Sequence, residues 1–257
     1  MKKGITKILS ACVFAFVVFL AAGTQSKAAV NMGVKQTGAG SSYVDLAWNA
    51  QLGAGHYHTQ FSQDGKNWID MEYSSSPSDS VYNLTQGASY YARVVAYNGS
   101  HYSGTHVMVG VSETAIVSTK PTEVTGLTQT AAGVNSVSMS WNASAGAASY
   151  VIYGYINYNW TQIGTSATNS ATITGVAATT STKFSVAAVK NVTGGTVTGD
   201  QCSGVEMKAI PIKVSRIAMQ YYWDSLKEAK YIWTDVNNAD GYQYEVKSAN
   251  GKKTYFR

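Results

Sequence analysis

Cysteine is scarce in this sequence, which has two in 257 residues, Cys12 and Cys202. Cys12 lies in an N-terminal segment that we expect to be removed, so the mature chain would keep Cys202 alone. An intrachain disulfide is then excluded, although small secreted domains often depend on such bonds. The domains must be held together by core burial instead, which is workable at about 90 residues per domain.

Long apolar runs are also lacking, apart from one near the N-terminus. The run from Ile8 to Ala22 is shorter than the roughly 20 apolar residues that span a bilayer. It follows a basic start and precedes small residues at Ser26 and Ala28, the −3 and −1 positions of a secretory cleavage site. We predict a signal peptide over residues 1–28, no membrane span after its removal, and a secreted or cell-surface protein. The alternative is a retained membrane anchor.

Excess charge of either sign is lacking once the signal is set aside. Lys2, Lys3, Lys7 and Lys27 all belong to the signal, so Lys and Arg fall from 19 to 15 against 14 Asp and Glu. A nucleic-acid partner requires a basic surface, and we predict no such partner.

Enzyme signatures are missing as well. The sequence contains no G-x-S-x-G elbow, no H-E-x-x-H and no P-loop. All four histidines lie between residues 56 and 106, so a Ser/His triad with a serine of the later part would have to bridge two domains. We predict that these residues form no enzyme and bind no cofactor.

What the sequence does contain is strand periodicity. Apolar residues alternate with polar ones at Val44, Leu46 and Trp48, and again before Trp141. Alternation with period two is typical of a strand with one buried face. Helical periodicity is absent apart from the signal and a short turn at 224–229.

The alternating segments recur at a fixed interval. Trp48, Trp141 and Trp233 are 93 and 92 residues apart. A tyrosine follows each of them nine positions later: Tyr57, Tyr150 and Tyr242. A period of this length indicates tandem domains rather than solenoid repeats.

Longer motifs surround these pairs. The second copy opens with KPTEVTGLTQT and continues with SVSMSW, and the first contains LTQGASYYARVVAYN. These segments resemble strands A and B and the E–F region of fibronectin type III domains. The resemblance covers nearly the whole mature chain and implies an all-β fold of tandem immunoglobulin-like sandwiches.

The resemblance also implies roles for single residues. Tyr90, six residues after Leu84, takes the tyrosine-corner position, whose hydroxyl closes on backbone just upstream. The second copy has Thr182 there, and a looser corner is expected. The predicted structural core is listed here: Trp48, Tyr57, Leu84, Tyr90, Trp141, Tyr150, Phe184, Trp233 and Tyr242.

The domain boundaries follow from the repeat. We predict fibronectin type III domains over 29–118 and 119–210, and the N-terminal part of an incomplete third domain over 211–257. The third copy lacks its later strands, so Trp233 and Tyr242 would miss one covering sheet. Either the chain is a fragment of a longer protein, which we favour, or it ends in a partly ordered stub.

The histidines raise the question of a metal site. His56 and His58 are two apart on one strand and share its outward face, whereas His101 and His106 follow in a loop and near a later strand. Because a strand would separate the two groups, ligands on both would lie about 10 Å apart. We predict no metal site but a polar surface with scattered histidines; His56 and His58 are the side chains from which a site would be built.

Aromatic residues mark the outward sheet faces. A tyrosine-rich face suits contact with sugars, peptides or a protein partner, and equally suits cross-strand pairing on a solvated sheet. The candidate ligand-contact residues are Tyr91, Arg93, Tyr97, Tyr153, Tyr155, Tyr158 and Trp160.

Together these features predict a non-catalytic extracellular protein of monomeric modules that acts in adhesion or in binding a protein or polysaccharide. The alternative is a passive spacer in a longer secreted carbohydrate-active or wall-associated enzyme.

Overall fold

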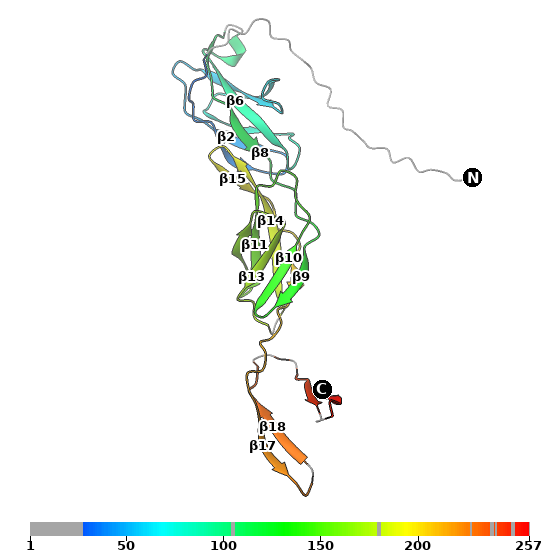
Figure 1. The fold of residues 1–257 in the computed structure, drawn as a ribbon. Helices are drawn as coiled ribbons and strands as arrows, with labels where there is room; N and C mark the ends of the chain where they lie inside the picture. Colours follow the sequence, from blue (N-terminus) through cyan, green and yellow to red (C-terminus); the bar gives the residue numbers. More distant parts are fainter. Residues whose placement is uncertain are drawn as a thin grey trace, which may run out of the picture.

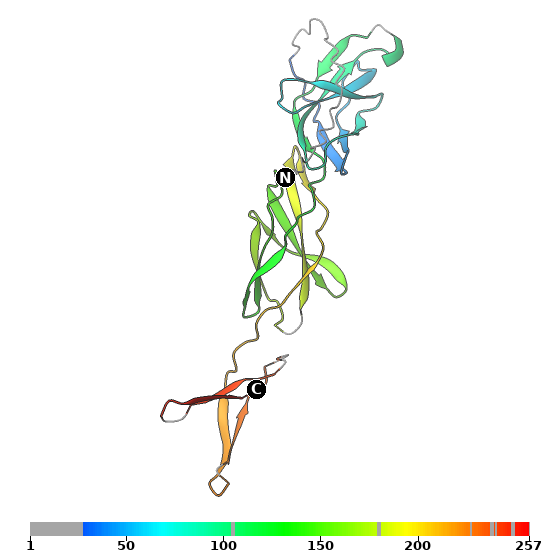
Figure 2. The ribbon, with the colours of Figure 1, turned by 90° about the vertical axis from the view of Figure 1, so that its right-hand side faces the viewer.

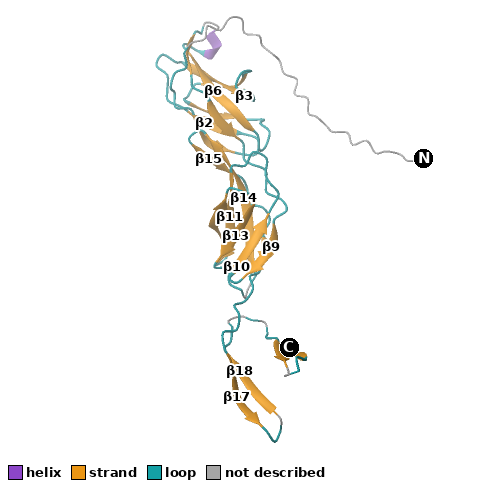
Figure 3. Cartoon of the chain, in the orientation of Figure 1, coloured by secondary structure: helices purple, strands orange, loops and turns teal. Residues whose placement is uncertain are grey.

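The computed structural model describes residues 28–256, apart from 104–105, 179–180, 227, 237–238, 240 and 248–249. Within these ranges the chain forms strands and one short 3₁₀ turn, η1 (His101–Ser103). Figures 1 and 2 show two β-sandwiches and a smaller C-terminal part following one another along the chain, and Figure 3 shows how strands dominate each of them. The predicted signal peptide lies outside the described residues, except for Ala28.

The first sandwich pairs a three-stranded sheet with a five-stranded one, both antiparallel. The smaller sheet has the order β1 (Lys35–Ala39), β2 (Val44–Ala47), β5 (Ser78–Val81). The larger has the order β4 (Ile69–Ser74), β3 (His56–Ser62), β6 (Ser89–Tyr97), β7 (Met108–Val111), with β8 (Ala115–Ser118) also paired to β6.

The second sandwich repeats this plan. Its smaller sheet has the order β13 (Ser170–Thr174), β10 (Ser136–Ser140), β9 (Thr128–Gly133). Its larger sheet has the order β12 (Asn159–Ser166), β11 (Ser149–Ile156), β14 (Thr182–Val192), β15 (Gly195–Thr198), with β16 (Val205–Met207) paired to β14.

Each sandwich encloses its own core, as the alternating pattern predicts. The first core runs from Met32 to Val117 and contains Trp48, Tyr57 and Leu84, with Tyr90 packed against it. The second core is built from other residues of the chain. It runs from Val124 to Ala209 and contains Trp141, Tyr150 and Phe184. Burying large apolar side chains at every second position is what holds each pair of sheets together.

The recurring Trp–Tyr pair has the same geometry in each copy. The ring centroids of Trp48 and Tyr57 lie 5.4 Å apart, and those of Trp141 and Tyr150 lie 5.3 Å apart, both edge to face at 67°. Each tyrosine hydroxyl also accepts a hydrogen bond from the backbone N–H three residues after the tryptophan. The donors are Gln51 at 3.1 Å and Ser144 at 3.0 Å.

The spacing of nine residues therefore has a physical cause. The tyrosine ring fills the core while its hydroxyl satisfies a backbone donor in the turn that joins two facing sheets. A buried phenol that finds a partner contributes both apolar area and a fixed turn. The expected tyrosine corner is also confirmed, because the Thr85 N–H donates to the Tyr90 hydroxyl at 3.0 Å.

The C-terminal part consists of two antiparallel hairpins. The first pairs β17 (Ile217–Trp223) with β18 (Glu228–Trp233), and the second pairs β19 (Tyr244–Lys247) with β20 (Lys253–Phe256). Trp233 and Tyr242 keep the pairing geometry, with centroids 5.5 Å apart and the Val236 N–H donating to the Tyr242 hydroxyl at 2.6 Å.

The prediction that these two residues lie in a core needs correction. Both are half-exposed, and Val236 is the only described residue after Ala209 that is fully buried. The two hairpins form separate two-stranded sheets. They supply the strand that carries Trp233 but not the facing sheet that would cover it.

Candidate functional site

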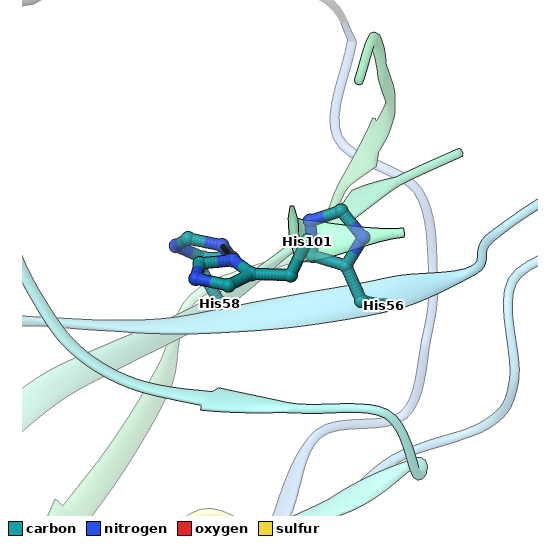
Figure 4. Close-up of side chains that lie close together, drawn as sticks. All are labelled: His56, His58 and His101. Carbon is teal, nitrogen blue, oxygen red and sulfur yellow. Dashed lines mark hydrogen bonds between the residues drawn. The ribbon is translucent and has the colours of Figure 1, made fainter. Parts of the chain in front are cut away.

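The histidines of the first sandwich gather in one place. His56 and His58 lie on the outward face of β3, because Tyr57, Thr59 and Phe61 between and beyond them point into the sandwich. His101 is the first residue of η1, in the loop that joins β6 to β7. Figure 4 shows the three side chains converging, two from the strand and one from the loop.

The ring nitrogens of these three histidines lie close together. One nitrogen from each of His56, His58 and His101 lies within 4.8 Å of those of the other two. The Nε2 atom of His58 and the Nδ1 atom of His101 are 3.3 Å apart. A fourth imidazole, His106, is exposed, and its ring centroid lies 5.2 Å from that of His56.

The predicted separation of about 10 Å was therefore wrong, and so was the scattering of the histidines. The face of β3 was predicted correctly, but the loop after β6 folds back over that face instead of continuing toward β7. The sheet spacing applies to side chains fixed on strands, whereas His101 is carried by the loop.

His56 is buried although it faces outward. Only 1% of it is exposed. Its ring stacks on Tyr97 at a centroid distance of 5.3 Å and an angle of 13°, and the rings of Tyr73 and His101 lie 5.9 and 5.5 Å away. The cover consists of aromatic rings, which exclude water but leave few polar partners.

Only one nitrogen of His56 is satisfied. Nδ1 lies 3.1 Å from the carbonyl oxygen of Gly99. Because a carbonyl only accepts, Nδ1 carries the proton and Nε2 of the neutral ring carries a lone pair. Nε2 is buried and has no hydrogen-bond partner among the residues that the structure describes.

A glycine makes this contact possible. A Cβ atom on Gly55 would lie 2.1 Å from the Gly99 carbonyl oxygen, so the two backbone segments can approach only if residue 55 has no side chain. The Gly55 N–H donates to the Tyr97 carbonyl at 2.7 Å in the same place. Gly55 thus allows the Gly99 carbonyl to reach the imidazole of His56, the next residue in the chain.

Burial shifts the ionisation of the surrounding groups. Desolvation lowers the pKa of His58, and the neighbouring His101, His56 and His106 lower it further against the attraction of Asp70. Desolvation and then Asp70 raise the pKa of Tyr97. A lowered pKa favours the neutral imidazole, which is the form that binds metals.

The candidate ligand-contact residues fall into two groups. In the first sandwich Tyr91 is exposed, whereas Arg93 and Tyr97 are half-buried. Arg93 stacks over the Trp68 ring at 4.1 Å and donates to Gln60 at 2.7 Å. Its guanidinium is therefore engaged within the sheet rather than free for a ligand.

The second group is more open. Tyr155 and Trp160 face each other across the β11–β12 hairpin, with centroids 5.3 Å apart, and both are exposed. Tyr158 at the hairpin turn is 90% exposed and has a left-handed φ of 63°. Tyr153 is half-buried on the same face.

A groove also opens at one edge of the first sandwich. Its volume is about 560 Å³, and apolar side chains of β3, β4 and β6 and of the loop after β5 line it. The lining includes Phe61, Met71, Leu84 and Tyr90. The sequence gives no sign of this groove, because it lies where β4 leaves the sheet edge.

No family model matches the sequence. The chain is 33% identical over 162 residues to Chitinase A1 of Niallia circulans, a match that covers 60% of this chain and 22% of that protein. The matched region is thus about a fifth of the relative's length.

Two solved structures are similar in arrangement. The FN1–FN3 domains of chicken CNTN1 match with a TM-score of 0.41 and 15% identity, covering 71% of this chain and 68% of that one. A two-domain fibronectin type III segment of chicken tenascin matches with a TM-score of 0.35 and 15% identity, covering 68% and 97%. The decisive features lie in the chain itself: three strands facing five in the same order twice, and a tyrosine corner.

The two sandwiches have the strand arrangement of fibronectin type III domains. In their usual strand names, β1, β2 and β5 are A, B and E, and the histidines lie on strand C and in the F–G loop. No helix among the described residues has the length and apolar character needed to cross a membrane.

The junction between the two fibronectin type III domains is bonded directly. The F–G hairpin of the second domain reaches the last strand of the first: the Thr193 N–H donates to the Ile116 carbonyl at 2.8 Å, and the Ile116 N–H donates to the Thr193 hydroxyl at 2.7 Å. Lys120 and Asp200 form a salt bridge at 2.6 Å across the same region.

A buried lysine completes this junction. Lys190 of β14 is 4% exposed, and its ammonium donates to the Gly87 carbonyl of the first domain. Ser89 lies 3.5 Å from the same ammonium, and burial lowers the pKa of Lys190. Neither the lysine nor the hairpin tip stands out in the sequence.

Proposed function

We propose that the tandem fibronectin type III domains act as a stiff, non-catalytic spacer in a longer extracellular protein. The junction carries this proposal, because short linkers alone leave neighbouring domains free to change their relative orientation. Here two hydrogen bonds between Ile116 and Thr193 and the bond from the buried Lys190 to Gly87 cross the junction, and the Lys120–Asp200 pair ties the linker to the second domain.

The likeness to Chitinase A1 supports a setting in a carbohydrate-active enzyme. The match covers about a fifth of that protein and 60% of this chain. A spacer of this kind would hold a catalytic or anchoring part at a fixed distance, and it explains why the sequence lacks catalytic motifs.

The stiffness is tested by residual dipolar couplings measured on the chain in a dilute aligned medium. We expect the two domains to share one alignment tensor. A double variant, Thr193→Ala with Asp200→Ala, removes the hydroxyl that accepts from Ile116 and the carboxylate that pairs with Lys120, and it should give two distinct tensors. Lys66→Ala, on an exposed turn of the first domain, is the matched control. Two different tensors in the wild-type chain would contradict the proposal.

A second candidate function is binding of a polysaccharide by the second domain. The observation that favours it is the exposed group of Tyr155, Tyr158 and Trp160, since flat aromatic faces with polar edges suit sugar rings. Insoluble chitin, suggested by the name of the relative, is the first ligand to test. A pull-down should retain the wild-type chain and lose Tyr155→Ala with Trp160→Ala, while Tyr82→Ala, exposed on the first domain, stays bound. Equal retention of all three would exclude this face.

A further inference from the structure

We propose that His56, His58 and His101 form a binding site for a divalent transition-metal ion, with zinc as the reference ion, that fastens the F–G loop of the first domain to strand β3. The site is separate from the junction and from the aromatic hairpin of the second domain. It goes beyond the spacer function and does not depend on it.

The spacing of the ligand atoms fits a tetrahedral ion. A zinc–nitrogen distance of about 2.0–2.1 Å places two nitrogens about 3.3 Å apart along a tetrahedral edge. The separation of His58 Nε2 and His101 Nδ1 is 3.3 Å. All three histidines offer a nitrogen within 4.8 Å of the others, so a small rotation of His56 or of the η1 turn closes the third distance.

The unsatisfied nitrogen of His56 is a second, independent observation. A buried lone pair without a partner is costly in an unoccupied state, and Nε2 of His56 is in this situation among the described residues. A metal ion would supply the missing partner. The Gly99 carbonyl at Nδ1 is the outer-shell acceptor that fixes the tautomer of metal-binding histidines.

The environment also favours an imidazole site. The aromatic cover of Tyr73 and Tyr97 lowers the exposure of the ligands, whereas His58 and His101 remain half-exposed and give the ion access. Imidazole nitrogens suit zinc, copper and nickel, and oxygen ligands suit calcium and magnesium. Three histidines without a carboxylate therefore select the former group.

Metal binding would act on the loop. The F–G loop carries His101 on the short η1 turn, and the loop is held to β3 by the contacts of His101 and Gly99 with the two strand histidines. An ion bridging His101 to His56 and His58 would join the loop to residues of β3 that lie 45 and 43 positions earlier in the chain. The expected result is a loop more resistant to proteolysis.

Isothermal titration of the tag-free chain with Zn²⁺ tests the proposal. We expect one equivalent to bind with a dissociation constant below about 1 μM, and no response to Mg²⁺ or Ca²⁺. His58→Gln and His101→Gln should each weaken zinc binding by at least about 100-fold, since loss of even an outer-shell partner costs roughly 10–100-fold. Both residues are half-exposed, so these variants should fold. An unfolding midpoint equal to that of the wild type, with both proteins measured in EDTA, verifies this.

His106→Gln is the matched control, because it removes an imidazole from the same patch but not from the group of three. It should leave the dissociation constant within a factor of about three. Zinc binding weaker than about 10 μM, or unchanged binding in His58→Gln and His101→Gln, would overturn the proposal. An equal loss in His106→Gln would also overturn it, because binding would then follow the number of histidines and not their geometry.

Discussion

At the scale of single residues, the Trp–Tyr pair shows what a sequence can and cannot convey. The alternation of apolar and polar residues predicts that Trp48, Tyr57, Trp141 and Tyr150 lie in the cores, because only one face of each strand is buried. The function of the phenol hydroxyl was not predicted, since it depends on the path of the turn between the two residues. That turn brings the N–H of Gln51 or Ser144 to the ring edge.

The hydroxyl of Tyr150 should contribute measurably to stability. Tyr150→Phe keeps the ring but leaves the Ser144 N–H without its acceptor, at a cost of about 1–2 kcal/mol for a partly buried hydrogen bond. Urea unfolding monitored by NMR signals of the second domain measures the loss. Tyr153→Phe, half-exposed on the outward face of the same strand, is the control and should stay close to wild type. Equal stabilities of Tyr150→Phe and wild type would show that water replaces the lost acceptor.

The turn at Asp64 should respond to acid. Hydrogen bonds from the N–H groups of Asn67 and Lys66 and from the Ser62 hydroxyl stabilise the carboxylate, so the pKa of Asp64 lies well below its usual 3.8. The native state then binds fewer protons than the unfolded one, and the stabilisation is complete above pH 3.8 and lost as the pH falls below it. Asp64→Asn should be less stable than wild type at pH 7.

The difference between Asp64→Asn and wild type should shrink as the pH is lowered from 4 to 2. Urea midpoints across this range measure it, and an NMR titration of the Asp64 carboxyl carbon gives the midpoint directly. A midpoint at or above 3.8 would contradict the assigned hydrogen bonds.

His58 and His101 mark the limit of residue-level prediction. The side of the strand on which His56 and His58 lie follows from parity. Their neighbourhood does not, because the loop conformation depends on the close approach of Gly55 to Gly99, which involves residues 44 positions apart. A glycine directly before a histidine on a strand is the one local signal that was available.

At the scale of elements, the sequence pattern predicts the strands of both sandwiches. It does not predict how far the β14–β15 hairpin extends. The alternation that predicts β10 and β11 says nothing of how far β14 extends. β14 continues to Val192 and carries its hairpin beyond the sheet to the first domain. Thr and Gly residues such as those at this tip are typical of a solvated loop, so no structural role could be predicted for them.

The C-terminal hairpins should open far more easily than the sandwiches. Two-stranded sheets are marginally stable on their own, and β18 is exposed on most of its length. Hydrogen exchange followed by mass spectrometry should show the amides of β18 exchanging much faster than those of β10. β10 is the matching strand of the second sandwich and ends directly before Trp141. Comparable protection of the two strands would mean that the hairpins gain a cover in solution, and the prediction would fail.

At the scale of the whole molecule, repetition could be predicted, but the contacts that fix one repeat against the next could not. The intervals of 93 and 92 residues indicate separate domains, and each of the two sandwiches has its own core. The junction depends on Lys190, which belongs to one strand but finds its partner 103 positions earlier. No local pattern distinguishes this lysine from a solvated one.

Lys190 should therefore couple the two domains. Lys190→Met keeps the apolar stem and removes the ammonium that donates to the Gly87 carbonyl. A hydrogen bond from a charged donor contributes about 1.5–3 kcal/mol, but burying the charge offsets part of this, as the lowered pKa of Lys190 indicates. We expect a net loss of about 1 kcal/mol, borne by the first domain at its Gly87 turn.

A urea titration followed residue by residue in NMR spectra measures this coupling, using amides of β6 for the first domain and β11 for the second. With a denaturant slope of about 1–3 kcal/mol per molar, the β6 midpoint should fall by roughly 0.3–1 M in Lys190→Met. The β11 midpoint should move less, since the methionine stem still packs on its own sheet. Lys66→Met, at an exposed turn, controls for loss of a positive charge. Unchanged β6 midpoints would mean that the two domains touch without stabilising each other, and a stiff spacer would then need another source of rigidity.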